Sequence, residues 1–443
     1  MSDILMRGVA LPSGRTTDLG VHDARLADPS SLRRPTRIDA GGLVALPGLV
    51  DLHTHLREPS PEPAETIASG TAAAARGGFT AVFAMANTTP VTDTAARVRG
   101  LRERSVGALA EVVPVGAITQ NLGGTAVADI EAMYAEGVTV FSDDGRCVMN
   151  AAVMRQALVR VGAIGGVIAQ HCQDHELAGA LACLPDRTGS ADTPTRWPRA
   201  AEAVIVARDV QLARDTGTHV HICHVSTAES VDVLRWAKSR GIPVTAEVTP
   251  HHLLLGDDRL DSLDPVFKVN PPLRGPDDRR ALQAALADGV IDIVATDHAP
   301  HLPRDKALPF PEAKPGLVGL EWALGVVLET MVTPGLLDFA AVADRLSYAP
   351  ARIGQIGARQ GRPLSVGEPA TFTLIDPTRR AVINQDDSLS QGRNNPYHGL
   401  NLPDPVLATF WAGRSTYVDP RWEAAYLLTP DGVRPATGQA TVG

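Results

Sequence analysis

Lysine is scarce in this chain, and the first half of the sequence has none. The only lysines among the 443 residues are Lys238, Lys268, Lys306 and Lys314. Arginine greatly outnumbers lysine, which is typical of GC-rich codon usage. The absence excludes any chemistry that depends on a lysine before position 238.

Cysteines and long apolar runs are also few. The four cysteines, which lack CxxC spacing, are Cys147, Cys172, Cys183 and Cys223. This pattern excludes a dense disulfide scaffold and favours free thiols in a reducing compartment. No stretch approaches the roughly 20 apolar residues of a membrane span. The first residues, MSDILMRGVALPSGR, lack the pattern of a signal peptide, so we expect a cytoplasmic protein.

The chain also lacks an excess of basic residues over acidic ones. The formal net charge of −9 and the pI near 5.8 argue against a nucleic-acid partner or an anionic membrane surface. An anionic substrate therefore needs a local cationic pocket. With 44% hydrophobic and 21% charged residues, the chain can bury a large core, and its length suits a large α/β barrel with a small appendage.

Strand-like apolar runs alternate with Ala-rich helical segments from Val50 onward. Two of the helical segments end at Gly217 and Gly241, as helix C-termini often do. The alternation predicts a parallel sheet, and eight repeats predict a closed (β/α)8 TIM barrel. A doubly wound open sheet is the alternative, which the lack of G-x-G-x-x-G after the first run disfavours. The eight runs are 50–55, 80–87, 111–119, 138–145, 166–172, 219–226, 243–250 and 291–300.

The two ends of the chain differ from the middle, because both show a pattern of short strands and turns. Neither end looks large enough to bury a core alone. We therefore predict a barrel over residues 50–354 and a small β-sandwich built jointly from residues 1–49 and 355–443.

Polar side chains stand at the ends of the predicted barrel strands. Chemistry in such barrels occurs at the C-terminal ends of the strands, whereas strand interiors carry branched apolar residues. Packing alone does not explain this placement. The residues concerned are His53, His55, Asn87, Asp143, Asp144, His171, His224 and Asp297.

The histidines predict a metal site. His53 and His55 are two apart on one strand, so both imidazoles point to the same face and form a half-site for zinc or another transition metal. An HxH pair alone also occurs in ordinary packing, but His171 and His224 at other strand ends favour the metal. His219 and His221 share the strand of His224, which lies nearest the strand end. His221 is expected to pack in the core or to support a ligand.

Carboxylates complete the predicted set. Asp143 or Asp144 could cap a helix or a turn, or could bridge two metal ions about 3.5–4 Å apart. Four histidines and two aspartates suit two metals better than one. Asp297, at the last strand, can bind metal, move a proton, or do both.

Cationic and polar groups near the barrel mouth indicate an anionic substrate. Arg57 follows the HxH pair by two residues, and its guanidinium can grip a carboxylate with two hydrogen bonds. Asn87 and His301 can add donors to the same group.

These residues carry a family pattern. The segments PGLVDLHTHLREP, AMANTTP, FSDDG, AQHC, ICHVST, AEVTPHHLLL, VNPPLR and ATDHAPH occur in order between about residues 40 and 320. Together they resemble the bacterial type I dihydroorotases of the metal-dependent amidohydrolase superfamily. LREP, NPPLR and TDHAPH are the most specific segments. GRPLSVGEPA extends the resemblance more loosely toward the C-terminus.

The resemblance implies an activity and assigns the metal ligands. The reaction is the reversible hydrolysis of dihydroorotate to N-carbamoyl-L-aspartate by a metal-bridging hydroxide, in pyrimidine biosynthesis. The resemblance also selects Asp144, rather than Asp143, as the bridge. One zinc would bind His53, His55, Asp144 and Asp297, and the second would bind His171, His224 and Asp144.

It further implies the roles of the remaining residues. Asp297 is the general acid/base, which passes a proton to the leaving amide nitrogen. Arg57, Asn87 and His301 hold the substrate carboxylate. The other predicted substrate contacts are His55, Asn270, Pro315 and Gly316.

Related enzymes supply the alternatives. Dihydropyrimidinase, hydantoinase and allantoinase bridge their metals with a carboxylated lysine on the fourth strand, which this sequence cannot provide because its first lysine is Lys238. A catalytically silent partner of aspartate transcarbamoylase is an alternative of another class. A homodimer is compatible with barrels of this type. The segment 181–200 does not align with the family pattern.

Overall fold

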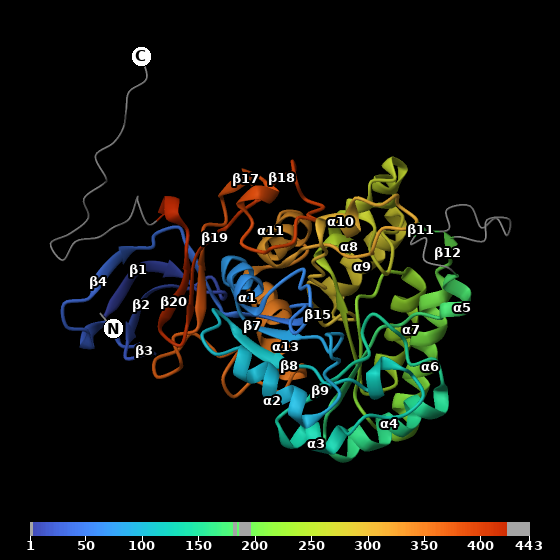
Figure 1. Ribbon diagram of the computed structural model, residues 1–443. Coiled ribbons are helices and arrows are strands. Elements are labelled where there is room, and N and C mark those ends of the chain that lie inside the picture. Colours follow the sequence, from blue (N-terminus) through green and yellow to red (C-terminus); the bar gives the residue numbers. More distant parts are fainter. Residues whose placement is uncertain (1–2, 180–183, 186–195, 423–443) are drawn as a thin grey trace.

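The computed structural model describes residues 3–179, 184–185 and 196–422 of the chain. Cys183 and most of the 181–200 segment therefore lie outside the described residues. Figure 1 shows an α/β part beside a smaller β-sheet. Within the described residues, no helix combines the length and the apolar character needed to cross a membrane.

Eight parallel strands form the centre of the α/β part. They are arranged as one sheet of three strands and one of five. The strands are β6 (Leu49–Thr54), β7 (Phe79–Ala84), β8 (Glu111–Pro114), β9 (Val140–Phe141), β10 (Val167–Gln170), β13 (Val220–Ile222), β14 (Val244–Val248) and β15 (Ile293–Val294).

Single bridges join the two sheets at both seams. Gly116, two residues after β8, pairs with Phe141 in β9, and Thr54 at the end of β6 pairs with His298, four residues after β15. The predicted α/β architecture with eight parallel strands is confirmed. The hydrogen-bonded ladder is interrupted at the seams, so the sheet is not continuously closed.

Helices surround these strands and begin and end where the sequence provides signals. The Thr66 side chain accepts from the Ser69 N–H at the start of α1, and Thr227 caps α7 in the same way. Gly217 ends α6 in the left-handed conformation. The longer helices are α1 (Ile67–Arg76), α2 (Ala95–Arg104), α3 (Ile130–Ala135), α4 (Ala151–Ala163), α6 (Ala200–Thr216), α7 (Ala228–Ser239) and α9 (Pro276–Asp288).

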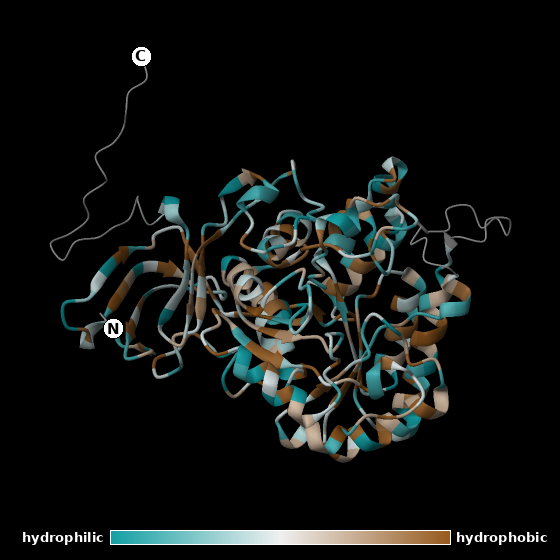
Figure 2. Ribbon diagram, in the orientation of Figure 1, coloured by the Kyte–Doolittle hydropathy of each residue, from teal (hydrophilic) through white to brown (hydrophobic). Residues whose placement is uncertain are grey.

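Shorter helices fill the connections. They are α5 (His175–Ala178), α8 (Pro250–Leu254), α10 (Pro303–Lys306), α11 (Ala323–Val327), α12 (Phe339–Ala343) and α13 (Ala349–Ile353). Apolar residues gather on the strands and on the helix faces turned toward them, while hydrophilic residues lie mainly outside (Figure 2). The largest hydrophobic cluster joins β7 through Phe79 and Val82 to α4 through Leu158 and to α6 through Val206.

Strands from both ends of the chain form one eight-stranded sheet. β5 pairs antiparallel with β16, with Leu46 opposite Thr373, as the shared pattern of the two ends predicts. Phe372 and Phe410 stack with ring centroids 4.6 Å apart in a separate core. The strands are β1 (Ile4–Ala10), β2 (Thr16–His22), β3 (Arg25–Ala27), β4 (Thr36–Asp39), β5 (Val44–Pro47), β16 (Phe372–Ile375), β19 (Val406–Trp411) and β20 (Arg414–Val418).

Two short strand pairs remain. β11 (Leu184–Pro185) lies beside β12 (Arg196–Trp197), and β17 (Arg380–Val382) pairs antiparallel with β18 (Asn401–Pro403). The segment between β17 and β18 reaches back to the loop that follows β15, where the His301 N–H donates to Asn394.

Candidate metal centre

Six buried histidine and aspartate side chains meet beyond the carboxyl ends of the parallel strands. They form two groups whose ligand atoms lie within 4.8 Å of one another, and Asp144 belongs to both. The first group is His53, His55, Asp144 and Asp297, and the second is Asp144, His171 and His224. The structure thus brings together the six residues that the family resemblance assigned as metal ligands, and it leaves out Asp143.

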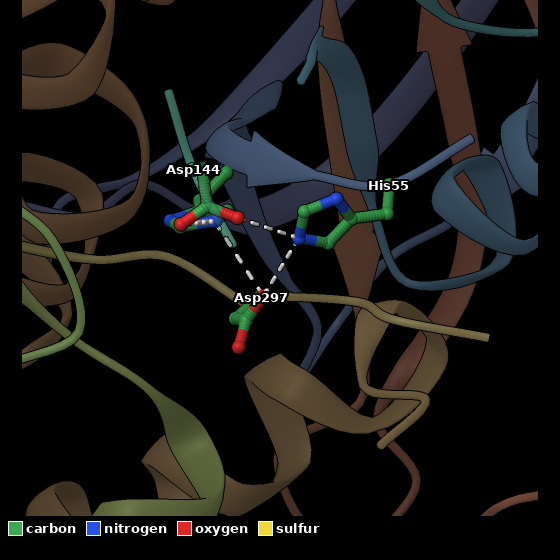
Figure 3. A group of neighbouring side chains, drawn as sticks. His55, Asp144 and Asp297 are labelled. Atoms are coloured by element: carbon green, nitrogen blue, oxygen red, sulfur yellow. Dashed lines mark hydrogen bonds and ion pairs between the residues drawn. The ribbon is translucent and has the colours of Figure 1, made fainter. Parts of the chain in front are cut away.

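The Asp144 carboxylate lies between the four imidazoles. Its Oδ1 is 3.2 Å from His53 Nε2, 3.3 Å from His171 Nδ1 and 3.4 Å from His224 Nε2. Its Oδ2 is 3.2 Å from His55 Nε2, which is also 3.0 Å from Asp297 Oδ1 (Figure 3). One carboxylate therefore faces both halves of the cluster, as a bridging ligand must.

The outer nitrogens of three imidazoles are engaged by oxygen atoms. His53 Nδ1 lies 2.6 Å from Glu247 Oε1, and His55 Nδ1 lies 2.9 Å from Asn87 Oδ1. His171 Nε2 lies 2.8 Å from Gln173 Oε1. An acceptor on the outer nitrogen places the proton there and leaves the inner lone pair for a metal.

Glu247 is itself held by further histidine contacts. Its Oε2 lies 3.0 Å from His221 Nε2, and His221 Nδ1 lies 2.8 Å from Thr245 Oγ1. His219 reaches the same hydroxyl at 2.8 Å. His221 therefore lies two contacts behind His53, through Glu247, and of His219, His221 and His224 it is His224 that joins the centre.

Mutual attraction of opposite charges sets the electrostatics of the centre. Burial acts to lower the pKa of His53, but Asp144, Glu247 and Asp297 outweigh it and raise that pKa well above its ordinary value. Burial acts to raise the pKa of Asp144, but the charge of His53 and the close contacts with His171 and His224 hold it well below the usual range.

Two other buried carboxyls behave in the same way. Burial opposes ionisation of Asp297, yet His53 and His55 lower its pKa. For Glu247, the neighbouring His53 and His221 lower the pKa to about 2 despite burial. These carboxylates therefore remain anionic at neutral pH.

Two buried atoms at the centre have no hydrogen-bond partner within the described part of the chain. They are His53 Nε2 and Asp144 Oδ1, which face each other at 3.2 Å. Unpaired buried polar atoms are costly, and a cation between them would satisfy both. The nitrogen and carboxylate donors are those that zinc prefers.

A third group of His53, Cys223 and Glu247 is a weaker candidate. His53 Nδ1 in that group is already engaged by Glu247. Burial raises the pKa of the Cys223 thiol, so the thiolate that would bind a metal does not form readily.

Asp143, the neighbour of Asp144, has a structural role. Its Oδ1 accepts from the backbone N–H of Ile118 at 2.8 Å and of Thr119 at 2.9 Å, and its Oδ2 accepts from the Thr119 hydroxyl. This side chain ties β9 to the loop after β8. The choice between the two aspartates, which spacing left open, therefore follows from their partners.

Three predicted site residues adopt the left-handed backbone conformation, which is uncommon outside glycine. They are Arg57 (φ 55°), His224 (φ 32°) and Asp297 (φ 46°). Such strain is usually found at functional sites, where surrounding packing holds it. Each residue lies two or three positions after the end of a strand (β6, β13 or β15), and its side chain joins the cluster or lines the adjoining cavity.

A cavity of about 230 Å³ opens beside the cluster. This is smaller than the range of about 300–1,000 Å³ for drug-sized ligands, so it suits a small molecule. All the predicted substrate contacts line it, namely His55, Arg57, Asn87, Asn270, His301, Pro315 and Gly316. Lys314, which the sequence analysis did not single out, lines it as well.

Arg57 and His301 line one side of this cavity, and Arg57 supplies its positive charge. Arg57 Nε donates to the Pro300 carbonyl at 3.2 Å, and within the described residues its Nη atoms have no hydrogen-bond partner. His301 Nε2 lies 2.7 Å from the Pro315 carbonyl oxygen. Burial and the nearby Arg57 lower the pKa of His301 well below its ordinary value, so the ring is neutral at neutral pH. A neutral ring that donates through Nε2 has only an acceptor at Nδ1.

The two asparagines are engaged by protein groups. Asn87 contacts His55 through Oδ1, and its Nδ2 donates to the Asp144 carbonyl at 3.3 Å. Asn270 Nδ2 donates to Gln173 Oε1 at 3.0 Å, whereas its buried Oδ1 has no partner among the described residues. Asn270 Oδ1 is thus available to a ligand N–H.

Sequence reasoning missed two residues that orient ligands. Glu247 stands in a buried strand, and an acidic residue among apolar neighbours there was an available signal. Gln173 follows His171 by two residues, and nothing in the sequence distinguished it from a surface residue.

The chain is similar in sequence to known proteins over nearly its whole length. Residues 42–230 match the family model described as Dihydro-orotase-like. A Streptomyces coelicolor dihydroorotase is 51% identical over 426 residues, covering 95% of this chain and 99% of that protein. A Mycobacterium tuberculosis dihydroorotase is 49% identical over 429 residues, covering 94% and 98%.

Solved structures match in fold. The L-hydantoinase of Arthrobacter aurescens superposes with a TM-score of 0.83 at 24% identity, covering 94% of this chain and 96% of that one. The dihydropyrimidinase of Brevibacillus agri gives 0.81 at 20% identity, covering 93% and 94%. At such identities the likeness supports the α/β fold alone.

Proposed function

Because the chain belongs to the dihydroorotase family, we propose that its buried cluster and the adjoining cavity are the active site for that family's reaction. The reaction is the reversible hydrolysis of dihydroorotate to N-carbamoyl-L-aspartate, a step of pyrimidine biosynthesis. The single observation that carries the assignment is the convergence of six buried ligand-type side chains on one small cavity.

The cluster is proposed to hold two zinc ions with Asp144 between them. His53, His55 and Asp297 would bind the first, and His171 and His224 the second. Asp144 belongs to both groups, and its Oδ1 is one of the two unpaired atoms. No lysine precedes Lys238, so an aspartate takes the place that a carboxylated lysine has in hydantoinases. Bound zinc would supply Lewis-acid polarisation of the amide carbonyl and acidification of the attacking water.

Asp297 is proposed as the proton carrier. Its Oδ1 contacts His55, while its other oxygen points away from His55 and Asp144 (Figure 3). Its lowered pKa keeps it anionic, so it can accept a proton from the attacking water. It would then deliver that proton to the ring nitrogen as the amide bond breaks. In the direction of ring closure the same carboxylate takes the proton back from that nitrogen.

Arg57 is proposed to bind the carboxylate on the dihydroorotate ring. Its guanidinium lines the cavity and is held through Nε, which leaves the Nη atoms for two parallel hydrogen bonds. Asn270 Oδ1 would accept from a ring N–H, and Pro315 and Gly316 would contact the ring. His55 and the second N–H of Asn87 would complete the contacts. The neutral His301 ring has one N–H, and at Nε2 it faces the Pro315 carbonyl. His301 can therefore donate to the substrate carboxylate only if it gives up the bond with Pro315.

The finer architecture is proposed along the same lines. A closed (β/α)8 barrel over residues 50–354 is supported by eight parallel strands and by the single bridges at both seams. A small sandwich from residues 1–49 and 355–443 is supported by the pairing of β5 with β16.

An activity assay with metal analysis tests the proposal. Zinc-loaded protein should convert dihydroorotate to N-carbamoyl-L-aspartate. The loss of ultraviolet absorbance of dihydroorotate measures the reaction. Asp297→Asn should lower kcat by about 10²–10⁴-fold, the range for loss of a general acid/base. Full activity in that variant would refute the role of Asp297. Turnover of hydantoin or dihydrouracil without turnover of dihydroorotate would refute the substrate. A zinc-loaded chain without turnover would support the silent-partner alternative.

A further inference from the structure

A segment from the C-terminal part of the chain, residues 388–395, packs against the loops of the cavity. Two buried glutamates fix it to the α/β part. The Leu389 N–H donates to Glu321 Oε1 at 2.9 Å, and the Gln391 N–H donates to Glu65 Oε1 at 3.1 Å. The hydroxyls of Ser388 and Ser390 bond to the same two carboxylates. The segment is thus anchored on both sides before it reaches the cavity.

Asn394, at the end of this segment, bonds to two loops at once. Its Nδ2 donates to the Ala299 carbonyl and to the Gly316 carbonyl, both at 2.9 Å. Its Oδ1 accepts from the His301 N–H at 3.2 Å. The side chain is 4% exposed, and both of its N–H groups are used. One buried amide therefore connects the loop after β15 to the loop at Gly316.

The backbone around Asn394 is closely packed against both loops. A Cβ at Gly392 would lie 2.7 Å from Pro300 Cβ and from Val318 Cγ1, so the segment is wedged between the two loops. A Cβ at Gly316 would lie 2.6 Å from His301 Nε2. With the loops packed this closely, displacement of one must move the other.

We propose that Asn394 is a positioning residue that sets the spacing between His301 and the Gly316 backbone, and so the affinity for the substrate. The inference rests on the proposed function, which assigns substrate contacts to those two residues. Asn394 acts through its partners, because Ala299, His301 and Gly316 line the cavity while its own amide lies behind them.

Substitution of Asn394 beside a matched control tests the proposal. Asn394→Asp keeps the acceptor for the His301 N–H but replaces the amide nitrogen with an oxygen, which faces the carbonyl oxygens of Ala299 and Gly316. Asn394→Ala removes all three bonds. Asn395→Ala is the control, because this adjacent buried amide accepts from the Tyr397 N–H at 2.9 Å and, within the described part of the chain, bonds to neither loop. Steady-state kinetics on dihydroorotate, zinc content and thermal unfolding are measured for each zinc-loaded variant.

Both Asn394 variants should raise KM by about 10- to 100-fold, the scale for a small misplacement of binding groups. The fall in kcat should be smaller, zinc content should match the wild type, and Asn395→Ala should keep its KM. If Asn394→Ala does not fold, Asn394→Asp, which preserves the volume, carries the comparison.

Equal KM values in the Asn394 variants and the Asn395→Ala control would overturn the proposal, as would a lower melting temperature with unchanged kinetics. Absence of turnover in the zinc-loaded wild type would overturn the proposed function itself. That failure is distinguishable because it appears before any variant is compared.

Discussion

His53 and Glu247 form a direct contact beneath the metal centre, with Nδ1 of the imidazole 2.6 Å from Oε1 of the carboxylate. Because neighbouring histidines hold the pKa of Glu247 at about 2, the carboxylate is ionised and can only accept. His53 therefore carries its proton on Nδ1 when neutral and presents the Nε2 lone pair to Asp144, 3.2 Å away. A residue 194 positions along the chain thus fixes the coordinating face of the first candidate ligand.

Glu247→Gln should weaken zinc binding. The amide still accepts from His53 Nδ1, but it loses the charge that makes the imidazole a better donor to the metal, and such changes cost about 10- to 100-fold in affinity. Competition with a chelator measures the effect. Glu321→Gln is the control, because this buried glutamate contacts Arg76 and the 388–395 segment instead of a ligand histidine. Equal zinc affinity in the two variants would contradict the role of Glu247.

The sequence predicted which metal-type side chains come together at the candidate centre, because strand ends are readable from periodicity. His53, His55, His171, His224 and Asp297 each follow an apolar run, and parallel strands bring such ends to one edge. The spacing of the sequence could not decide whether Asp143 or Asp144 is the metal ligand, because two adjacent aspartates differ only in the partners that the fold gives them.

The supporting layer was not predictable in the same way. Gln173 and Asn394 act through contacts that depend on loop conformation, which apolar periodicity does not encode. The bond between His301 and the Pro315 carbonyl likewise changes what the ring can donate, although His301 lies in the expected place. The interruption of the sheet at both seams is also a matter of local backbone geometry.

Zinc should stabilise the protein more at pH 8 than at pH 6. In the metal-free protein the carboxylates raise the pKa of His53 and of His171 after outweighing burial. That protonated form adds stability below the ordinary pKa of about 6.5, and the contribution is lost as pH rises through the raised pKa. Zinc requires neutral imidazoles, so protons compete with it at pH 6.

Thermal unfolding with and without zinc at the two pH values measures this difference. The zinc-dependent rise in Tm should be larger at pH 8 by on the order of a few degrees. An equal or larger rise at pH 6 would show that the histidines do not exchange protons for metal.

Arg57→Met should separate charged from neutral substrates. The variant keeps an apolar side chain of similar length but loses the guanidinium, and charged hydrogen bonds are worth about 1.5–3 kcal/mol. KM for dihydroorotate should therefore rise by about 10- to 100-fold. Any turnover of dihydrouracil, which lacks the carboxylate, should be unchanged. A parallel loss on both rings would mean that Arg57 supports the fold of the loop and does not bind the carboxylate.

Asp143 and Asp144 should give opposite results when each is changed to asparagine. Asp144→Asn removes the carboxylate shared by both groups, so zinc content should fall by at least one ion per chain. Asp143→Asn places an amide against the N–H groups of Ile118 and Thr119, so it should cost about 1–3 kcal/mol of stability and leave zinc content intact. Metal analysis and chemical denaturation distinguish the two outcomes. Loss of zinc in Asp143→Asn alone would reverse the assignment, because it would show that the carboxylate paired with Ile118 and Thr119, and not the one among the histidines, holds the metal.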